Sequence, residues 1–508
     1  MKSLLNKRTL ILTVLFFFAF FIRFIFISKG PFHYDTLDLA LTAQKTLKTF
    51  TLHYEHGAGY PLTVILGAFS IFIFKFFGVT DPVFCVNFMS VLAGAVGVLL
   101  LFFLVEKLFD DSTELTTNPE LSRGVGFHKA VMSAILLACF APHVVISTFG
   151  KSLTLSICFS LSSAYYMCCY VQENKKVYLL LSALFLGFCA ASRLSDVLVF
   201  LPISYLYFST GKFHYERVRS FVAFCFIVSV TTAIYYLPML FETGFFPFAD
   251  VLTSSQQAEF LGVFSYVSKA ALHWLRKTFL FNGILLIAFG FVFMVIKRQI
   301  RQFLFLVIWF LVLQLFYGNV SSSGPRYLVI AWIPLVIAQG SFLGSFKGKG
   351  FYLALFVVLA VALFAFLRFE PVLEFRHRRA LQVEFAEWVS HKTSADSVII
   401  GLDESIFLEY YAKRQVLHRP ITCDRNTVEE FFDEVLDKLL EKGRKVYIVS
   451  SAMIAYDSCG VFRKRLFERY DKVFIGQKRN EDWHHALLNQ VLFTEQLYQI
   501  KKKGLLGG

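Results

Sequence analysis

The sequence is poor in charged residues and lacks the motifs by which many soluble enzymes bind nucleotides or metals. Only 17% of its 508 residues are charged, well below the roughly 25% typical of soluble domains. It contains no GxGxxG or Walker-type loop, so nucleotide binding by those devices has no support. No CxxC or HExxH pattern occurs, which leaves a dedicated zinc site equally unsupported.

Cysteines outside apolar runs are scarce. Seven of the nine cysteines lie within apolar stretches, where they are expected to fill the core. Cys423 and Cys459 lie in the polar C-terminal region. Spacing alone leaves open whether these two form a disulfide or remain free.

Long apolar runs dominate the chain, which is 56% hydrophobic and contains 62 Phe. Runs of about 20 residues can cross a hydrocarbon core of about 30 Å. We therefore predict a polytopic α-helical membrane protein with about eleven transmembrane helices plus outer juxtamembrane helices. The first run is long for a signal peptide and no A-x-A site follows, so we expect it to be retained. The predicted spans are 9–28, 84–105, 129–148, 152–171, 177–193, 195–210, 220–240, 278–297, 302–317, 326–346 and 350–368.

Segment 60–78 decides the orientation, because it is apolar but ambiguous as a span. If it does not cross, most basic residues of the short connections lie on the side of the N-terminus; if it crosses, they all move outward. Cytoplasmic connections of membrane proteins carry the excess of Lys and Arg. We therefore predict a half-embedded outer helix at 60–78, a cytoplasmic N-terminus, and an extracytoplasmic C-terminal region in the cell membrane. Loops 29–83 and 241–277 then lie on the outer side. The net charge of +14 reflects this arrangement rather than a nucleic-acid surface.

The composition becomes that of a soluble domain near residue 370. We predict a transmembrane domain over 1–369 and an extracytoplasmic α/β domain over 370–508. HRRALQVEFAEWVSHKT reads as an amphipathic helix, and SVIIG and KVYIVSS as strands, with helical segments between them. This alternation predicts a small, partly parallel sheet.

The stretch FHYDTLDLALTAQ, residues 32–44, sets two carboxylates just after the first span. Asp35 as a helix N-cap, with Asp38 three residues on, would satisfy free N–H groups and complement the helix dipole. Asp35, with His33 and Tyr34 beside it, could equally be a general base or cation ligand at a cavity mouth. The two interpretations are compatible, because a capping carboxylate is rigidly placed.

A second polar stretch, TLHYEHGAGYPL, holds Glu55 between His53 and His56. Two carboxylates and histidines can bind a divalent cation, or divide acid and base roles by shifted pKa values. An exposed polar turn before a helix that starts at Pro61 explains the same residues. No cofactor is certain from this pattern.

Three cations stand at outer span junctions: Lys151, Arg193 and Arg326. A cation at a span end is often an interfacial anchor. Together on one face, the three could instead form an electropositive pocket for a phosphate, for which arginine's bidentate fork is suited.

The order of these features resembles the membrane glycosyltransferases of the type-C fold, specifically the branch with protein O-mannosyltransferases and the lipid A aminoarabinose transferase. The resemblance covers most of the chain in order. The matching segments are HYDTLDLA after the first span, YPL opening an outer helix that ends FKFFGVTDP, then APHVVIS, GFCAASRLSDVLVFLP, RYLVIAWIPLVIAQG, ALQVEFAEWV and YYAKR.

The resemblance implies roles for particular residues. By position, Asp35 is the catalytic or acceptor-activating acid, and Glu55 is the acid before the proline of the juxtamembrane helix. Arg326 and Tyr327 correspond to a late Arg-Tyr pair. Many members also carry an acid about a dozen residues after the proline of the second outer junction. Here PHVVISTFGKSLT has no carboxylate, so the second-acid role and metal binding stay open.

The sequence thus predicts a glycosyltransferase that moves a sugar from a polyprenyl-phosphate donor to a protein, glycan or lipid acceptor outside the membrane. Asp35 would act as the base, with His33, Tyr34, His56, Lys151, Arg193, Arg326 and Tyr327 binding substrate. One alternative is a transporter or flippase of lipid-linked glycans, which would place ionisable groups in mid-membrane and often show inverted repeats. Another is a non-catalytic subunit whose soluble domain binds a partner.

Overall fold

The computed structural model divides the chain into two compact units. The first comprises Met1–Ser28 and Leu39–His377, and the second comprises Lys29–Asp38 with Arg378–His485 and Gln490–Gly508. The segment carrying Asp35 belongs to the second unit. The structure describes residues 2–54, 60–110, 119–209, 215–243, 278–279, 283–320, 325–402, 404–454, 457, 459–478 and 495–503.

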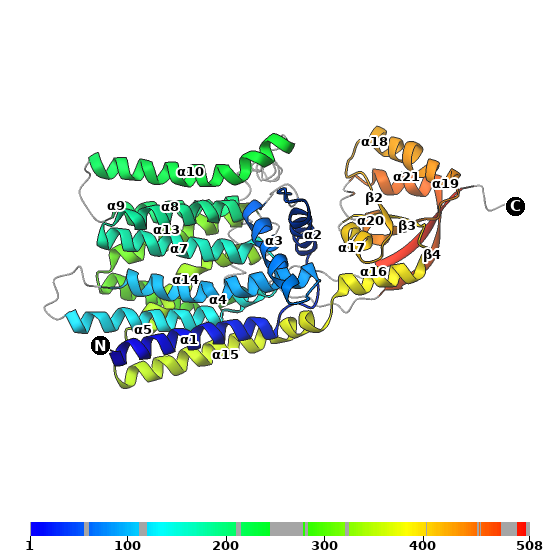
Figure 1. The fold of residues 1–508 in the computed structure, drawn as a ribbon. Helices are drawn as coiled ribbons and strands as arrows, with labels where there is room; N and C mark the ends of the chain where they lie inside the picture. Colours follow the sequence, from blue (N-terminus) through cyan, green and yellow to red (C-terminus); the bar gives the residue numbers. More distant parts are fainter. Residues whose placement is uncertain are drawn as a thin grey trace. The chain divides into compact units, whose positions relative to one another are not determined.

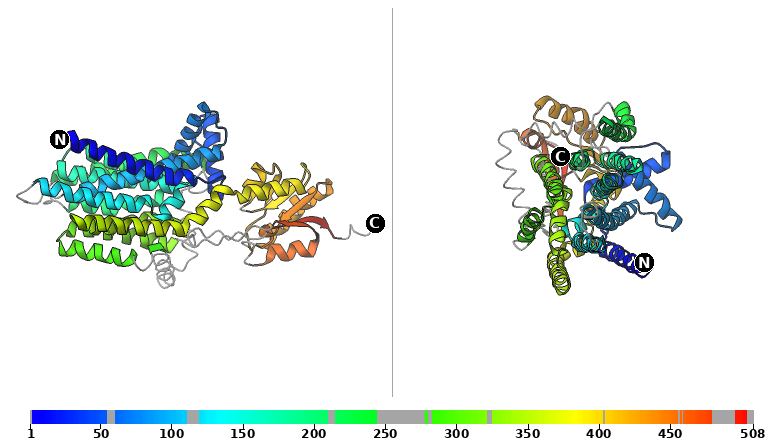
Figure 2. Two further views of the ribbon diagram at one scale, coloured as in Figure 1. Left: turned by 90° about the horizontal axis from the view of Figure 1, so that it is seen from below. Right: turned by 90° about the vertical axis from the view of Figure 1, so that its left-hand side faces the viewer.

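The first unit is a helical bundle whose long helices run nearly parallel, as the end-on view in Figure 2 shows. Its described elements are α1 (Lys2–Ile25), α2 (Tyr34–Thr49, whose first residues belong to the second unit), α3 (Pro61–Phe76), α4 (Pro82–Leu108), α5 (Pro119–Ala138), α6 (Ala141–Ser147), α7 (Ser152–Glu173), α8 (Lys176–Ser192), the 3₁₀ helix η1 (Leu194–Val199), α9 (Phe200–Phe208), α10 (Tyr215–Thr243), a helix over Gly283–Ile296, α13 (Ile300–Val320), the 3₁₀ helix η2 (Pro325–Leu328), α14 (Val329–Leu343) and α15 (Lys349–Arg378).

Within the described residues, seven helices are long and apolar enough to cross a membrane, and the bent pair α5–α6 would make an eighth. The other predicted spans correspond to shorter apolar helices. α7 and α14 are central, with 83% of their most apolar windows buried, whereas the corresponding windows of α1 and α15 are 17% buried. The exposed faces of the peripheral helices carry large apolar side chains, including Phe17, Phe21 and Phe356. Such faces suit contact with lipid, so the chain is a polytopic membrane protein.

Helix α3 runs at a steep angle to the long helices at one end of the bundle, and the N-terminus lies at the other end (Figure 1). Its first residue, Pro61, follows Tyr60, which adopts a left-handed conformation that turns the chain sharply. The helix packs against α4 and α8. An oblique apolar helix of this kind supports a position at the membrane surface for segment 60–78, and its failure to cross remains a prediction.

The bend between α5 and α6, 59° in size, has a local cause. Pro142 lacks an N–H, so it cannot donate to the carbonyl of Ala138 four residues earlier. Arg23 of α1 supplies the donor instead: its Nη1 lies 3.2 Å from that carbonyl oxygen, and its Nη2 lies 2.8 Å from Nδ1 of His143. The fully buried Arg23 thereby stabilises the break.

Helices α5 and α14 approach closely through small residues. A Cβ at Gly340 would lie 2.1 Å from Oγ of Ser133, and one at Gly344 would lie 2.5 Å from the backbone of Lys129. The glycines are four residues apart, as are their partners, which is the small-residue packing common between membrane helices.

The second unit contains a five-stranded sheet of order β2-β1-β3-β5-β4. β1, β2 and β3 are parallel, while β5 is antiparallel to both β3 and β4. The segments predicted as strands are β1 and β3, and both are buried throughout. The described elements are α16 (Leu381–Lys392), β1 (Val398–Gly401), α17 (Ser405–Tyr410), β2 (Gln415–His418), α18 (Arg425–Glu430), the π-helical η3 (Phe431–Asp437), α19 (Lys438–Glu441), β3 (Val446–Val449), α20 (Ser450–Ile454), α21 (Val461–Arg469), β4 (Tyr470–Lys478) and β5 (Glu495–Lys502).

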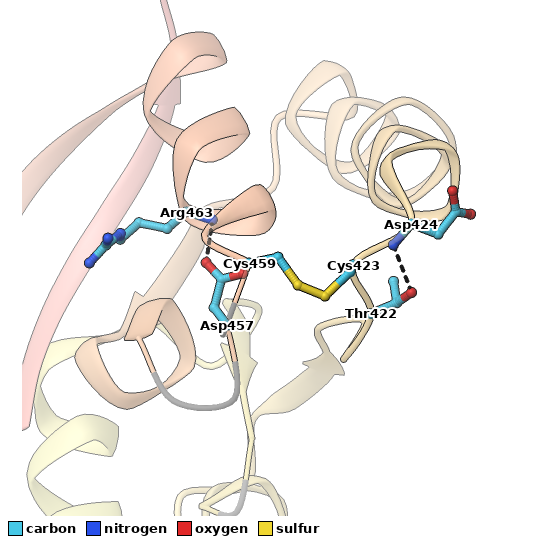
Figure 3. The surroundings of a disulfide bond; sticks show 6 residues. All are labelled: Thr422, Cys423, Asp424, Asp457, Cys459 and Arg463. Atoms are coloured by element: carbon cyan, nitrogen blue, oxygen red, sulfur yellow. Dashed lines mark hydrogen bonds between the residues drawn. A yellow bond between two sulfur atoms is a disulfide. The ribbon is translucent and has the colours of Figure 1, made fainter. Parts of the chain in front are cut away.

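A disulfide joins Cys423, just before α18, to Cys459, just before α21 (Figure 3). The pairing that spacing alone left open is therefore present. The two cysteines are 36 residues apart in sequence, so the bond closes a loop that contains β3. In the same unit, Phe432 of η3 stacks on Phe462 of α21 at 5.3 Å between ring centroids.

Candidate functional site

Three cations surround the ring of Tyr327 in the first unit, and we call Lys151, Arg193 and Arg326 the basic cluster. Nζ of Lys151 lies 5.8 Å from the ring centroid, and Cζ of Arg193 and of Arg326 lie 4.3 and 4.9 Å from it. Nη2 of Arg326 also donates to the hydroxyl of the same tyrosine at 3.1 Å. The structure thus brings together four of the predicted site residues from junctions far apart in sequence.

Each member of the cluster sits where a helix begins or ends. Lys151 precedes α7 in an extended conformation, and Arg193 follows α8, also extended. Arg326 and Tyr327 lie in η2, directly before α14. The breaks between these helices therefore bring the three cationic side chains together around Tyr327.

Two cations of the basic cluster are buried, and both of its arginines have a nitrogen without a hydrogen-bond partner in the part of the chain that the structure describes. Lys151 is 2% exposed and Arg193 is 6% exposed. Nη1 of Arg193 and Nε of Arg326 are buried without a hydrogen-bond partner among the described residues. Burial, together with the guanidinium groups of Arg326 and Arg193, holds the pKa of Lys151 well below its usual range. Such a group of cations is suited to an anionic ligand, since an anion would pair the remaining donors and relieve the repulsion.

Asp196 and Tyr317 hold Arg193 in place, and sequence reasoning missed both. Nε of Arg193 donates to the hydroxyl of Tyr317 at 3.1 Å and lies 3.7 Å from Oδ1 of Asp196. Tyr317 in turn donates to Oδ1 of Asp196, while Ser156 donates to Oδ2. The spacing Arg193-x-x-Asp196 was a signal that could have revealed the carboxylate. Nothing in the sequence around Tyr317 pointed to it.

Asp35 lies inside the first turn of α2, so its predicted role as N-cap is wrong. The helix begins at Tyr34, and the acceptor at its start is the ring of His33. Nδ1 of His33 accepts from the backbone N–H of Asp35 at 3.2 Å and lies 3.3 Å from Oδ1 of the same residue. An imidazole just before the helix can reach this donor, so the carboxylate is not needed there. Asp35 is 9% exposed and still complements the helix dipole.

The remaining predicted acid and histidine, Glu55 and His56, lie outside the described residues. Among the described residues, no group of three His, Cys, Asp or Glu side chains could hold a metal ion. The divalent cation that Asp35 and Glu55 would share therefore stays a prediction.

Part of the chain matches a protein-family model. Residues 46–217 match the model described as the Protein O-mannosyl-transferase TMEM260 N-terminal domain. This range runs from α2 to the start of α10 and includes Lys151 and Arg193. A search of curated proteins found no match.

Solved structures resemble the whole chain. ArnT from Cupriavidus metallidurans in the apo state superposes with a TM-score of 0.62 at 13% identity, over 98% of each chain. The same protein bound to undecaprenyl phosphate gives 0.57 at 12% identity, over 97% of this chain and 98% of that one. An oligosaccharyltransferase from Archaeoglobus fulgidus, in complex with Zn and sulfate, gives 0.55 at 14% identity, over 91% of this chain and 71% of that one.

Proposed function

Because the chain has the fold of the type-C glycosyltransferases, we propose that it transfers a sugar from a polyprenyl-phosphate donor to an acceptor. The transfer takes place at the outer face of the membrane. One of its structural relatives, ArnT, has been solved with undecaprenyl phosphate bound. The matched family model is that of an O-mannosyl-transferase, which makes polyprenyl-phosphate mannose the first donor to test.

The basic cluster is the observation that carries this proposal. The phosphate of such a donor leaves already ionised, so the site must stabilise negative charge rather than supply an acid. Buried cations with unpaired N–H groups provide that stabilisation most strongly in a partly dry site. Arg193 and Arg326 each have a buried nitrogen available for it, and Lys151 adds a third cation.

Asp35 is proposed as the general base. As the acceptor hydroxyl attacks the anomeric carbon, Asp35 takes the hydroxyl proton and the bond to the phosphate oxygen breaks, with inversion at the anomeric carbon. Its place in the first turn of α2 supports this role, because the helix start holds the carboxylate in one position. His33, Tyr34 and His56 remain candidates for contacts to the sugar or the acceptor.

The Cys423–Cys459 disulfide supports an extracytoplasmic position for the second unit. Disulfides persist in oxidising compartments and are rare in the cytoplasm. The distribution of basic loops independently supports the same position for the C-terminal unit.

Sugar transfer by the purified full-length chain tests the proposal. The protein would be mixed with polyprenyl-phosphate mannose and a peptide, glycan or lipid acceptor, and lipid that co-purifies with it would be identified by mass spectrometry. A bound polyprenyl-phosphate sugar, or transfer of its sugar, is expected. A soluble ligand in mid-membrane with no transfer would favour a transporter instead.

Replacing Asp35 tests the base directly. We expect Asp35→Ala to lower the transfer rate by about 10²-fold or more, because proton removal loses its general base. Asp38→Ala, three residues on in the same helix, is the matched control and should transfer normally. Near-normal transfer by a folded Asp35→Ala protein would exclude Asp35 as the base.

A further inference from the structure

Asn87 of α4 makes hydrogen bonds to two separate segments in the first unit. Its Oδ1 accepts from the backbone N–H of Gly150 at 2.6 Å, and its Nδ2 donates to the carbonyl of Ser28 at 3.1 Å. Ser28 N–H in turn donates to the carbonyl of Thr148 at 2.9 Å. The side chain is fully buried, so its amide joins the end of α1 to the segment that leads into Lys151.

The same face of α4 supports the backbone of that segment. Oγ of Ser90, one helical turn after Asn87 in sequence, accepts from the N–H of Lys151 at 3.3 Å. Val86 lies so close that a Cβ at Gly150 would come within 2.5 Å of its side chain. A glycine is needed at this position because the backbone rests directly on α4. The backbone on which Lys151 stands is thus held from one side by consecutive turns of a single helix.

This support bears on the basic cluster, because a lysine carries its charge at the end of four methylene groups. Lys151 is nearly completely buried, and like charges on Arg193 and Arg326 repel its ammonium group. Repulsion favours moving the ammonium group away from them, and a fixed backbone limits how far the lysine can move. Hydrogen bonds to the backbone N–H groups of Gly150 and Lys151 provide that restraint, and they use no side-chain atom of the cluster.

We propose that Asn87 is a positioning residue for Lys151, which it holds in place to bind the phosphate of a lipid-linked ligand. The inference rests on the proposed function for the nature of the ligand. The polar side chain is retained in the apolar bundle because it satisfies a backbone donor and a backbone acceptor on two segments at once. Loss of the amide would free the Gly150–Lys151 backbone and weaken the binding of the anion by Lys151.

Binding of undecaprenyl phosphate to the purified full-length chain in detergent tests this role. We expect Asn87→Ala to weaken binding by about tenfold, the size typical of lost support behind a ligand-binding side chain. Ser163→Ala is the matched control: it also removes a buried hydrogen bond, from Oγ to the carbonyl of Ser182 at 2.7 Å. It lies about 18 Å from Lys151 along α7 and should bind normally. Equal affinity for the two variants would overturn the proposal.

A double-mutant cycle separates positioning from a general loss of packing. If Asn87 acts through Lys151, Asn87→Ala should have almost no further effect on affinity once Lys151→Met is present. If the losses of affinity caused by Asn87→Ala and Lys151→Met simply multiplied in the double variant, the role of Asn87 would be merely structural. Should Asn87→Ala fail to fold, Ser90→Ala removes only the acceptor for Lys151 N–H, and a smaller loss of affinity is expected in the same cycle.

The readouts also distinguish this proposal from the proposed function. In a transferase assay, Asn87→Ala should lower kcat/KM for the lipid-linked donor, and this effect should disappear when Lys151→Met is already present. Binding that depends on Asn87 in a protein without transferase activity would contradict the proposed function alone. Absence of undecaprenyl phosphate binding by the unaltered protein would overturn the positioning role.

Discussion

Arg193 of the membrane bundle and Arg469 of the α/β unit have opposite electrostatic surroundings. Arg469 is ion-paired with Glu429 at 2.9 Å, with Asp437 at 3.0 Å and with Asp433. Arg193 is more deeply buried, yet it faces two other cations and one carboxylate, and one of its nitrogens has no partner among the described residues.

The difference separates two uses of charge. A cation buried in an apolar bundle is costly unless it is fully paired, so incomplete pairing there indicates a function. Arg469 joins α21 to η3 and α18 on the surface of a folded unit, where a network of ion pairs contributes to stability. We therefore expect changes in the basic cluster to affect activity, and changes in the Arg469 network to affect stability.

Removing Arg193 should have the largest effect of the changes considered. It tests whether the basic cluster serves activity. We expect Arg193→Ala to lower sugar transfer by about 10²–10³-fold, because a charge-stabilising donor is lost in a partly dry site. Arg193→Lys should recover only part of the rate, since lysine lacks the bidentate fork. Arg219→Ala, an exposed arginine of α10, is the control. Normal transfer by a folded Arg193→Ala protein would show that the cluster does not serve the reaction.

Opening the disulfide should reduce the stability of the second unit alone. For a bond that joins cysteines 36 residues apart, loop-closure entropy predicts a loss of about 3–4 kcal/mol. Replacing Cys423 and Cys459 together by serine should reproduce the effect of a reductant. Faster amide hydrogen exchange in β3 would report this loss of stability. Exchange in α7, which belongs to the first unit, would serve as the internal reference. Equal loss of protection in α7 would contradict the separation of the two units.

Removing Arg469 should cost less stability and leave transfer unchanged. Its side chain is 27% exposed, so solvent screens its pairs, and we expect Arg469→Ala to destabilise the second unit by about 1–2 kcal/mol. Arg425→Ala is the matched control, because this arginine of α18 is 68% exposed and reaches Glu429 only at 3.7 Å. A change in transfer rate with Arg469→Ala would show that the Arg469 network affects activity as well as stability.

Acid should produce the smallest effect, through Asp437. Burial opposes ionisation, but hydrogen bonds from Tyr470 and Lys502 and the charge of Arg469 hold the pKa of Asp437 below its usual range. The stabilisation is therefore present above the unfolded-state pKa of about 4 and is lost as the pH falls through the folded-state value. Hydrogen exchange in the second unit between pH 5 and pH 3, approximately, would reveal this loss. Asp437→Asn should flatten that dependence, and an unchanged slope would exclude Asp437 as its source.

Hydropathy predicted the membrane-spanning character of the chain, because crossing a bilayer requires a run of apolar residues that a sequence displays directly. The strands β1 and β3 were visible for a similar reason, as short apolar runs. β4 and β5 were not, since their alternating burial is weaker in sequence. The resemblance to type-C glycosyltransferases also followed from the order of motifs and is confirmed by the fold.

The site was predicted only in part. Lys151, Arg193 and Arg326 stand out in sequence because cations are rare beside apolar runs. Asp196 pairs with a residue three positions away and could have been found. Tyr317 and Asn87 resemble ordinary residues of apolar helices, and only the packing of separate helices reveals their partners. The N-cap assigned to Asp35 failed because a neighbouring imidazole competes for the same backbone donor.

The sequence by itself determined that this chain crosses membranes, that its C-terminal part folds as α/β, and that cations stand at the helix junctions. These properties depend on residue type and periodicity within single segments. Only the tertiary structure decided that three junctions meet around Tyr327, that Cys423 pairs with Cys459, and that Asn87 joins α1 to the Lys151 segment. Those are contacts between segments 36 to 170 or more residues apart, and no local pattern encodes them.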